Sequence, residues 1–189
     1  MAYYYSHHPY YGGAQWPNTV PYGGYYPTWP AYGNPYGFGG SGGGWPDERQ
    51  RPDLRDNGGN PHVINMEEAA KRNTDFRRAI WTGRHLQVVL MSIDPGSDIG
   101  LEVHPNVDQF IRIEEGYGLV QMGPRRDQLN FARRVSEDDA IMVPAGTWHN
   151  LTNIGPRPLK LYTIYAPPEH PFGTVHRTKA EAEAAEQHA

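Results

Sequence analysis

The chain has 189 residues, a net charge of −4 at pH 7 and a pI near 6.1. This length suits one domain of ordinary size plus additional sequence. The weak net charge argues against a dedicated nucleic-acid-binding protein, which normally carries a basic surface. There is no cysteine, so disulfides and thiolate metal sites are excluded, and any metal must be bound by histidine, carboxylate or amide groups.

The N-terminus lacks the basic and apolar pattern of a secretory signal peptide. No run approaches the ~20 apolar residues that a membrane helix requires. We therefore expect synthesis in the cytoplasm, with no membrane partner and no nucleic-acid partner.

Residues 1–46 have an unusual composition. They contain 10 of the 13 tyrosines, 11 of the 22 glycines and no Asp, Glu, Lys or Arg. With almost no aliphatic residues this segment cannot form a packed core, so we predict a disordered or polyproline-II-like tail. The charged stretch that follows, residues 47–60, is predicted to be a linker.

The composition of the tail resembles the Gly/Pro/Tyr-rich tails of bacterial spore-coat proteins. Uncharged Tyr/Gly-rich chains self-associate. Two interpretations of residues 1–46 remain open: a dispensable tail, or a segment that associates with itself or with coat proteins and so directs the protein to a spore coat.

Two short helices are predicted at the borders of a folded domain, which we place at residues 61–177. Asn65 followed by Glu68 has the spacing of a capping box and indicates the start of the first helix. Thr178 and Glu181 repeat this spacing at the start of a C-terminal Ala/Glu-rich helix within residues 178–189.

Between the helices, short apolar runs bounded by turn signals indicate a series of strands. The predicted strands are 85–93, 101–105, 109–114, 117–122, 139–144 and 159–166. Many short strands without β–α–β alternation predict an all-β sandwich or barrel.

Polar residues cluster around the strands predicted at 101–105 and 109–114. Side chains two residues apart on a strand share a face, so Glu102 and His104 point the same way. If the isoleucines of the second strand line the interior, Gln109 enters it and Asp108 does not. Gln109 is therefore the preferred site residue of this strand, and Asp108 is the alternative.

A second polar group lies in the stretch VPAGTWHNLTN. Pro144 ends a strand, Gly146 permits a sharp bend, and His149 begins a returning strand that can meet the first group. Asn150 and Asn153 are expected to satisfy backbone groups of the following turn.

These two stretches resemble the two motifs of the cupin superfamily over about residues 85–166. The first motif has two His residues separated by one residue, then Glu and Gly, and the second has Pro, Gly, His and Asn. The corresponding residues here are Glu102, His104, Gln109, Gly116, Pro144, Gly146, His149 and Asn153. The chain looks most like small single-domain, mannose-6-phosphate isomerase-like cupins. The resemblance implies an RmlC-like double-stranded β-helix, or jelly-roll barrel, with short flanking helices, usually as a homodimer.

The resemblance also implies a metal site, with two departures from the family pattern. Glu102 replaces the first His and Gln109 replaces the usual Glu, so one negative charge is preserved at a different position. Glu102, His104 and His149 supply the two imidazoles and one carboxylate of many divalent metal sites with open positions, and Gln109 is a neutral fourth donor. We predict a divalent ion (Mn, Fe, Zn or Ni). The alternative is a barrel without metal whose polar groups satisfy each other or bind water.

The remaining polar residues suggest few further roles. The basic candidates for anchoring a phosphosugar are Arg84, Arg112 and Lys160, and alternation turns Arg112 away from the site. Three residues of the Pro-rich segment after the last strand are expected at the surface, with closure of the barrel mouth as the alternative: Glu169, His170 and His176.

Three functions remain open. A metalloenzyme acting as a Lewis acid would perform sugar isomerase-like chemistry on a sugar-like small molecule. A non-catalytic structural or assembly protein would use the barrel as a stable module. An Fe(II) dioxygenase is the third. The preferred interpretation is a metal-binding cupin displayed in a coat through its tail, with catalytic residues unidentified because Glu102, the candidate base, is committed to the metal.

Overall fold

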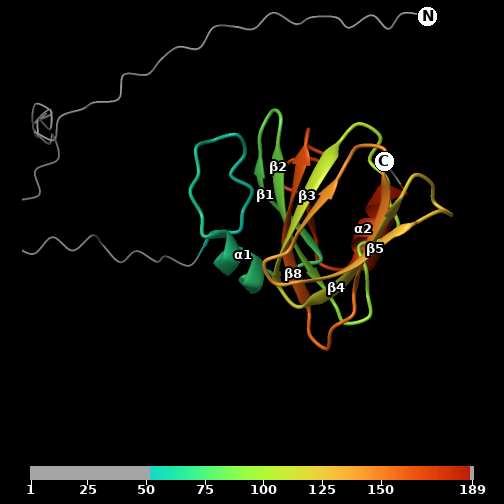
Figure 1. The fold of residues 1–189 in the computed structure, drawn as a ribbon. Helices are drawn as coiled ribbons and strands as arrows, with labels where there is room; N and C mark the ends of the chain where they lie inside the picture. Colours follow the sequence, from blue (N-terminus) through green and yellow to red (C-terminus); the bar gives the residue numbers. More distant parts are fainter. Residues whose placement is uncertain (1–51, 188–189) are drawn as a thin grey trace, which may run out of the picture. The chain divides into compact units, whose positions relative to one another are not determined.

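The computed structural model of the protein describes residues 52–187 (Figure 1). The prediction for residues 1–46 falls outside this range. In chain order the described elements are α1 (Met66–Arg72), β1 (Arg77–Thr82), β2 (Gln87–Ile93), β3 (Asp108–Glu115), β4 (Tyr117–Gly123), β5 (Phe131–Ser136), β6 (Ala140–Val143), β7 (Trp148–Asn153), β8 (Leu159–Ala166), β9 (Val175–His176) and α2 (Lys179–Glu186).

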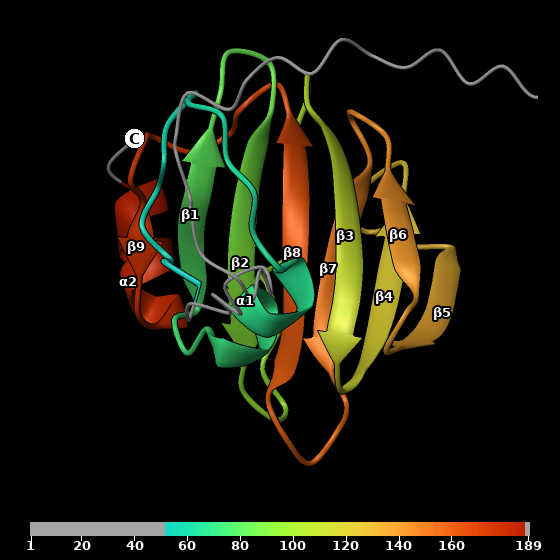
Figure 2. The same cartoon turned by 90° about the vertical axis from the view of Figure 1, so that its left-hand side faces the viewer.

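The strands form two antiparallel sheets. The larger has the order β6-β3-β8-β2-β1-β9 and the smaller the order β5-β4-β7. Figure 2 shows the larger sheet in front of the smaller one, with α1 lying over its outer face. Since strands distant in sequence are neighbours in the sheets, the arrangement is a jelly roll. The predicted all-β cupin fold with short flanking helices is confirmed.

Alternation along the central strand β8 builds both cores of the domain. Leu159, Leu161 and Tyr165 point between the sheets and are at most 1% exposed. Burying each leucine contributes about 1.5–3 kcal/mol relative to an exposed position. On the opposite face Tyr162 packs against a smaller cluster that includes Ala69 of α1. The helix therefore covers the outer face of the sheet while the main core fills the barrel.

Both predicted helix starts are confirmed. Asn65 Oδ1 accepts a hydrogen bond from the Glu68 amide at 3.0 Å, and Thr178 Oγ1 accepts one from the Glu181 amide at 3.2 Å. These side chains satisfy amides that have no partner within the helix. Ala182 of α2 is 2% exposed and joins the main core, so α2 is packed onto the barrel.

Five of the six predicted strands match β2, β3, β4, β6 and β8 to within about two residues. The strand predicted at 101–105 is wrong, because this segment makes only one isolated bridge, at Glu102, and a second isolated bridge precedes it at Asp98. Gly100 has a φ of +96° and its amide donates to Asp98 Oδ1 at 2.8 Å, which bends the chain between the two bridges. The returning strand predicted to begin at His149 is β7. Three strands were not predicted: β1 and β5, which both contain adjacent arginines, and the two-residue β9.

Gly116, the glycine of the first motif, lies in the tight turn between β3 and β4. Its φ is +102°, and a Cβ built there would lie 3.1 Å from the Leu159 Cα. A side chain is therefore excluded both by backbone conformation and by the close approach of β8.

Residues 52–60, which the sequence predicted as part of a linker, are attached to the barrel. The Asn57 amide donates to the Ile80 carbonyl at 2.9 Å, and Asp56 Oδ2 accepts from Thr82 Oγ1 at 2.6 Å and from the Gly173 amide at 2.9 Å. These bonds hold the segment along β1. None of the helices within residues 52–187 has the length and apolar character to span a membrane.

Candidate metal centre

The two sequence motifs meet at one pair of residues. The Glu102 amide donates to the His149 carbonyl at 3.0 Å, and the His149 amide donates to the Glu102 carbonyl at 2.9 Å. Opposite residues of such an antiparallel pair project their side chains from the same face, about 4.5–5.5 Å apart at Cβ. The backbone pairing therefore brings a carboxylate and an imidazole, 47 residues apart in sequence, to one site.

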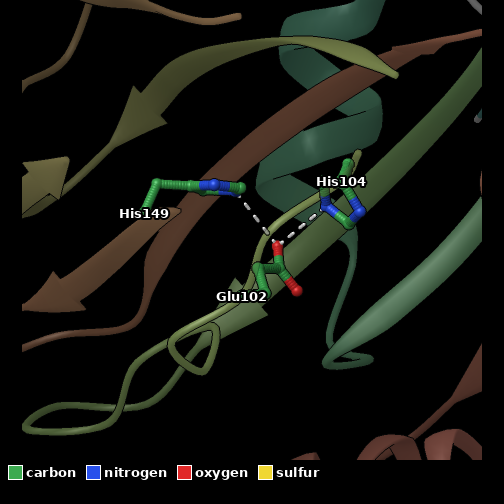
Figure 3. A group of neighbouring side chains, drawn as sticks. All are labelled: Glu102, His104 and His149. Carbon is green, nitrogen blue, oxygen red and sulfur yellow. Dashed lines mark hydrogen bonds and ion pairs between the residues drawn. The ribbon is translucent and has the colours of Figure 1, made fainter. Parts of the chain in front are cut away.

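His104 completes the group from the same segment as Glu102. Its backbone carbonyl accepts from the Gly146 amide at 2.8 Å, which ties this segment to the turn of the second motif. One ligand atom from each of Glu102, His104 and His149 lies within 4.8 Å of the other two (Figure 3). The structure thus brings together three of the four predicted metal ligands.

The two imidazoles present their Nε2 atoms to the same carboxylate oxygen. His104 Nε2 lies 3.4 Å and His149 Nε2 lies 3.3 Å from Glu102 Oε1 (Figure 3). The opposite ring nitrogens contact acceptors: His149 Nδ1 lies 3.0 Å from the Thr147 carbonyl oxygen, and His104 Nδ1 lies 3.1 Å from Glu169 Oε1. A ring whose Nδ1 donates to its acceptor leaves the Nε2 lone pair available to a cation beside Glu102, so these two acceptors orient both rings for metal binding.

A carboxylate beside two imidazole nitrogens is stabilised by a positive charge among them. His149 Nε2 is buried and has no hydrogen-bond partner within the described range. Burial raises the pKa of the Glu102 carboxyl, but the His104 and His149 side chains beside it outweigh this and lower it to about 2. Burial lowers the pKa of His104, and its contacts with Glu102 reverse the direction and raise it. Without metal a proton on His104 supplies the positive charge, and a divalent cation can replace that proton.

Gln109 and Asp108 lie on opposite faces of β3, as alternation predicted. Gln109 is 4% exposed, and its Nε2 donates to Thr163 Oγ1 at 3.0 Å. Its Oε1 is buried and has no hydrogen-bond partner among residues 52–187. Asp108 is exposed and accepts from the Ala145 amide at 2.8 Å. Gln109 thus has an unused buried oxygen donor, and its role as fourth ligand stays a prediction. The unpartnered His149 Nε2 and Gln109 Oε1 atoms, together with the set of two imidazoles and one carboxylate, fit a divalent cation.

A cavity of about 350 Å³ opens beside Glu102 and His104. Three residues of the segment after β8 line it, as the alternative of closing the barrel mouth expected: Glu169, His170 and His176. Glu169 is also exposed, as the sequence predicted, whereas His170 and His176 are partly buried. The buried amide of Gln87 explains the difference. Its Nε2 donates to the His170 carbonyl at 2.9 Å and its Oε1 accepts from the His170 amide at 3.0 Å, which clamps this segment across the mouth.

Burial and the nearby Arg77 charge lower the pKa of His170 to about 3, so its ring is neutral near pH 7. The ring packs edge-on against Tyr165, with centroids 5.1 Å apart, and Tyr165 packs in the same way against His104 at 5.5 Å. Tyr165 therefore links the residues that close the mouth to the candidate metal ligands.

The sequence prediction missed Arg77, which also lines the cavity. Its side chain is 2% exposed, although it lies on a strand that begins with two arginines. The available signal was alternation on β1, where Ala79, two residues on, is also buried.

None of the basic residues that the sequence suggested for phosphate binding lines the cavity. Arg112 pairs with Asp138, Lys160 bonds to Ser92, and Arg84 lies in the exposed turn after β1.

The two turn asparagines differ. Asn153 is 1% exposed, and its side chain donates to the Ile93 and Arg157 carbonyls and accepts from the Gly155 amide, as expected. Asn150 Oδ1 is buried and has no hydrogen-bond partner in the described part of the chain.

Comparison with known proteins gives one family and several relatives. Residues 89–165 match the family model described as cupin domain. The uncharacterized protein YrkC of Bacillus subtilis (strain 168) is 64% identical over 133 residues, which are 70% of this chain and 72% of that one. The uncharacterized protein L612 of Acanthamoeba polyphaga mimivirus is 43% identical over 115 residues, 60% of this chain and 70% of that one. The crystal structure of BH2720 from Bacillus halodurans has 64% identity and a TM-score of 0.69, and covers 69% of this chain and 99% of that one.

Glu169 orients His104, so its replacement tests the arrangement of the site. Glu169→Gln is expected to weaken Zn²⁺ binding by about 10-fold or more, because loss of the carboxylate acceptor reduces the basicity and fixed orientation of the His104 ring. Competition with a chromophoric chelator measures the affinity. Glu137→Gln, which alters an exposed carboxylate paired with Lys71, is the matched control and should leave Zn²⁺ affinity unchanged. Equal Zn²⁺ affinity in Glu169→Gln and wild type would contradict this role.

Proposed function

The chain belongs to the cupin family, and on this premise we propose that its barrel is a divalent-metal-binding module that acts on a small oxygen-containing molecule. Glu102, His104 and His149 are the proposed ligands, with Gln109 as a fourth donor. The observation that carries the proposal is the convergence of two imidazole Nε2 atoms on one partly buried carboxylate oxygen, with each ring's other nitrogen beside an acceptor.

A bound divalent cation with open positions polarises a carbonyl or hydroxyl oxygen of a ligand. The chain supplies the enclosure: the Gln87 amide fixes the segment that closes the mouth, and Tyr165 packs between that segment and His104. We favour a substrate without phosphate, since none of the basic residues considered for a phosphosugar lines the cavity. Isomerase-like chemistry on an unphosphorylated sugar and Fe(II)-dependent oxygenation both suit this donor set, and the two-histidine, one-carboxylate composition favours the second.

Elemental analysis of purified protein tests the metal proposal. Wild type is expected to contain close to one equivalent of a divalent transition metal per chain, and Glu102→Gln and His149→Ala are expected to lose most of it because each removes a ligand. Asp108→Asn is the control, since it changes an exposed carboxylate on the other face of β3. Equal trace metal in all four proteins, with folding verified by circular dichroism, would refute the proposal.

We further propose that residues 1–46 attach this module to an assembly such as a spore coat. The supporting observation is composition: 10 tyrosines and no Asp, Glu, Lys or Arg in 46 residues favour association through aromatic contacts. A barrel that folds without this segment is supported by the related Bacillus halodurans chain, since 99% of that chain matches only 69% of this one.

Deletion of residues 1–46 tests the second proposal. The truncated protein is expected to stay monodisperse under concentrations and salt at which the full chain sediments as large assemblies, while its metal content remains that of the full chain. Sedimentation velocity and elemental analysis provide the two readouts. Identical sedimentation of the full and truncated chains would contradict a role in assembly.

A further inference from the structure

A buried guanidinium lies beside the candidate metal ligands. Arg77 Nη1 donates to Glu186 Oε1 at 2.8 Å, and Nη2 lies 4.0 Å from Glu102 Oε2, beyond hydrogen-bond distance. The Nε atom is buried and has no hydrogen-bond partner among the described residues. A buried charge is strongly disfavoured without an anion beside it. Glu186 is the anion that Arg77 hydrogen-bonds.

Glu186 is positioned to leave Arg77 without unfolding its helix. Its side chain is 56% exposed, and it is the last residue of α2. The helix is anchored nearer its start by Ala182, which is 2% exposed in the main core, and by the ion pair between Lys179 and Asp98 at 2.6 Å. Rotation of Glu186 into solvent therefore breaks one contact and keeps those that dock α2.

The charges around the cavity favour a ligand that carries one negative charge. Three carboxylates, Glu102, Glu169 and Glu186, line the cavity together with one guanidinium, Arg77, so two negative charges remain. One divalent cation balances them. A ligand carboxylate that takes the place of Glu186 on Arg77 keeps this balance, whereas a phosphate dianion adds a negative charge.

We propose that the cavity binds a small carboxylic acid whose carboxylate replaces Glu186 on Arg77. A second oxygen next to the carboxyl group, as in a 2-hydroxy or 2-oxo acid, faces the group formed by Glu102, His104 and His149. The placement of this second oxygen rests on the proposed metal function, while the exchange at Arg77 does not. A cavity of about 350 Å³ is near the lower end of the roughly 300–1,000 Å³ range of ligand sites, which restricts the acid to a few carbon atoms.

Calorimetric titration of the full chain with glycolate tests this exchange. Glu186→Gln is expected to bind glycolate at least about threefold more tightly than wild type, because the substitution removes the internal competitor for Arg77. Glu183→Gln is the matched control, since Glu183 lies on the same helix, is 58% exposed and does not contact Arg77. Its glycolate affinity should equal that of wild type. Glycolamide, the uncharged counterpart of glycolate, should not distinguish the three proteins.

The titrations are repeated with zinc-loaded and chelator-treated samples whose zinc content is measured. Equal or weaker glycolate binding by Glu186→Gln, or no glycolate binding by any of the proteins, would overturn the inference. If the protein takes up zinc but Glu186→Gln binds glycolate no more tightly than wild type, the exchange at Arg77 is refuted and the metal proposal stands. If the protein takes up no zinc but Glu186→Gln still binds glycolate more tightly than wild type, the metal proposal is refuted and the exchange at Arg77 is supported. Circular dichroism verifies that each variant is folded.

Discussion

The candidate site depends on the reciprocal backbone hydrogen bonds between Glu102 and His149. These two bonds, rather than a flexible loop, fix the separation of the carboxylate and the imidazole. A shift of one residue in this pairing would replace His149 with Trp148 or Asn150 on the site face, because side chains alternate along a strand. The register of β7 therefore determines whether a metal site exists.

Hydrogen bonds outside the ligand group determine what the ligands present. The Thr147 carbonyl and the Glu169 carboxylate accept from the two imidazoles at the nitrogens that face away from Glu102. When each Nδ1 donates in this way, each Nε2 is available to a cation beside the ionised Glu102 carboxylate. The same carboxylate lies near Arg77, so the metal group and the guanidinium belong to one electrostatic unit that lines one cavity.

Local patterns in the sequence predicted much of this structure. Capping spacing located both helices, alternation placed Gln109 inside and Asp108 outside, and motif spacing brought the ligands of two segments together. The positions of Arg77 and His170 were not predictable in this way. Arg77 is buried because Glu186, 109 residues away, pairs with it, and His170 is held by the Gln87 amide 83 residues earlier. Such partners are set by the assembled sheets, and no local pattern reports them.

The central claim is that two imidazoles and one carboxylate bind a common cation inside the barrel. Anomalous diffraction from crystals of the metal-loaded protein, collected at the absorption edge of the bound metal, tests it most directly. The account predicts a single strong anomalous peak about 2.0–2.2 Å from the Nε2 atoms of His104 and His149 and from a Glu102 oxygen. A peak elsewhere on the chain, or bonded to only one of these three residues, would contradict it.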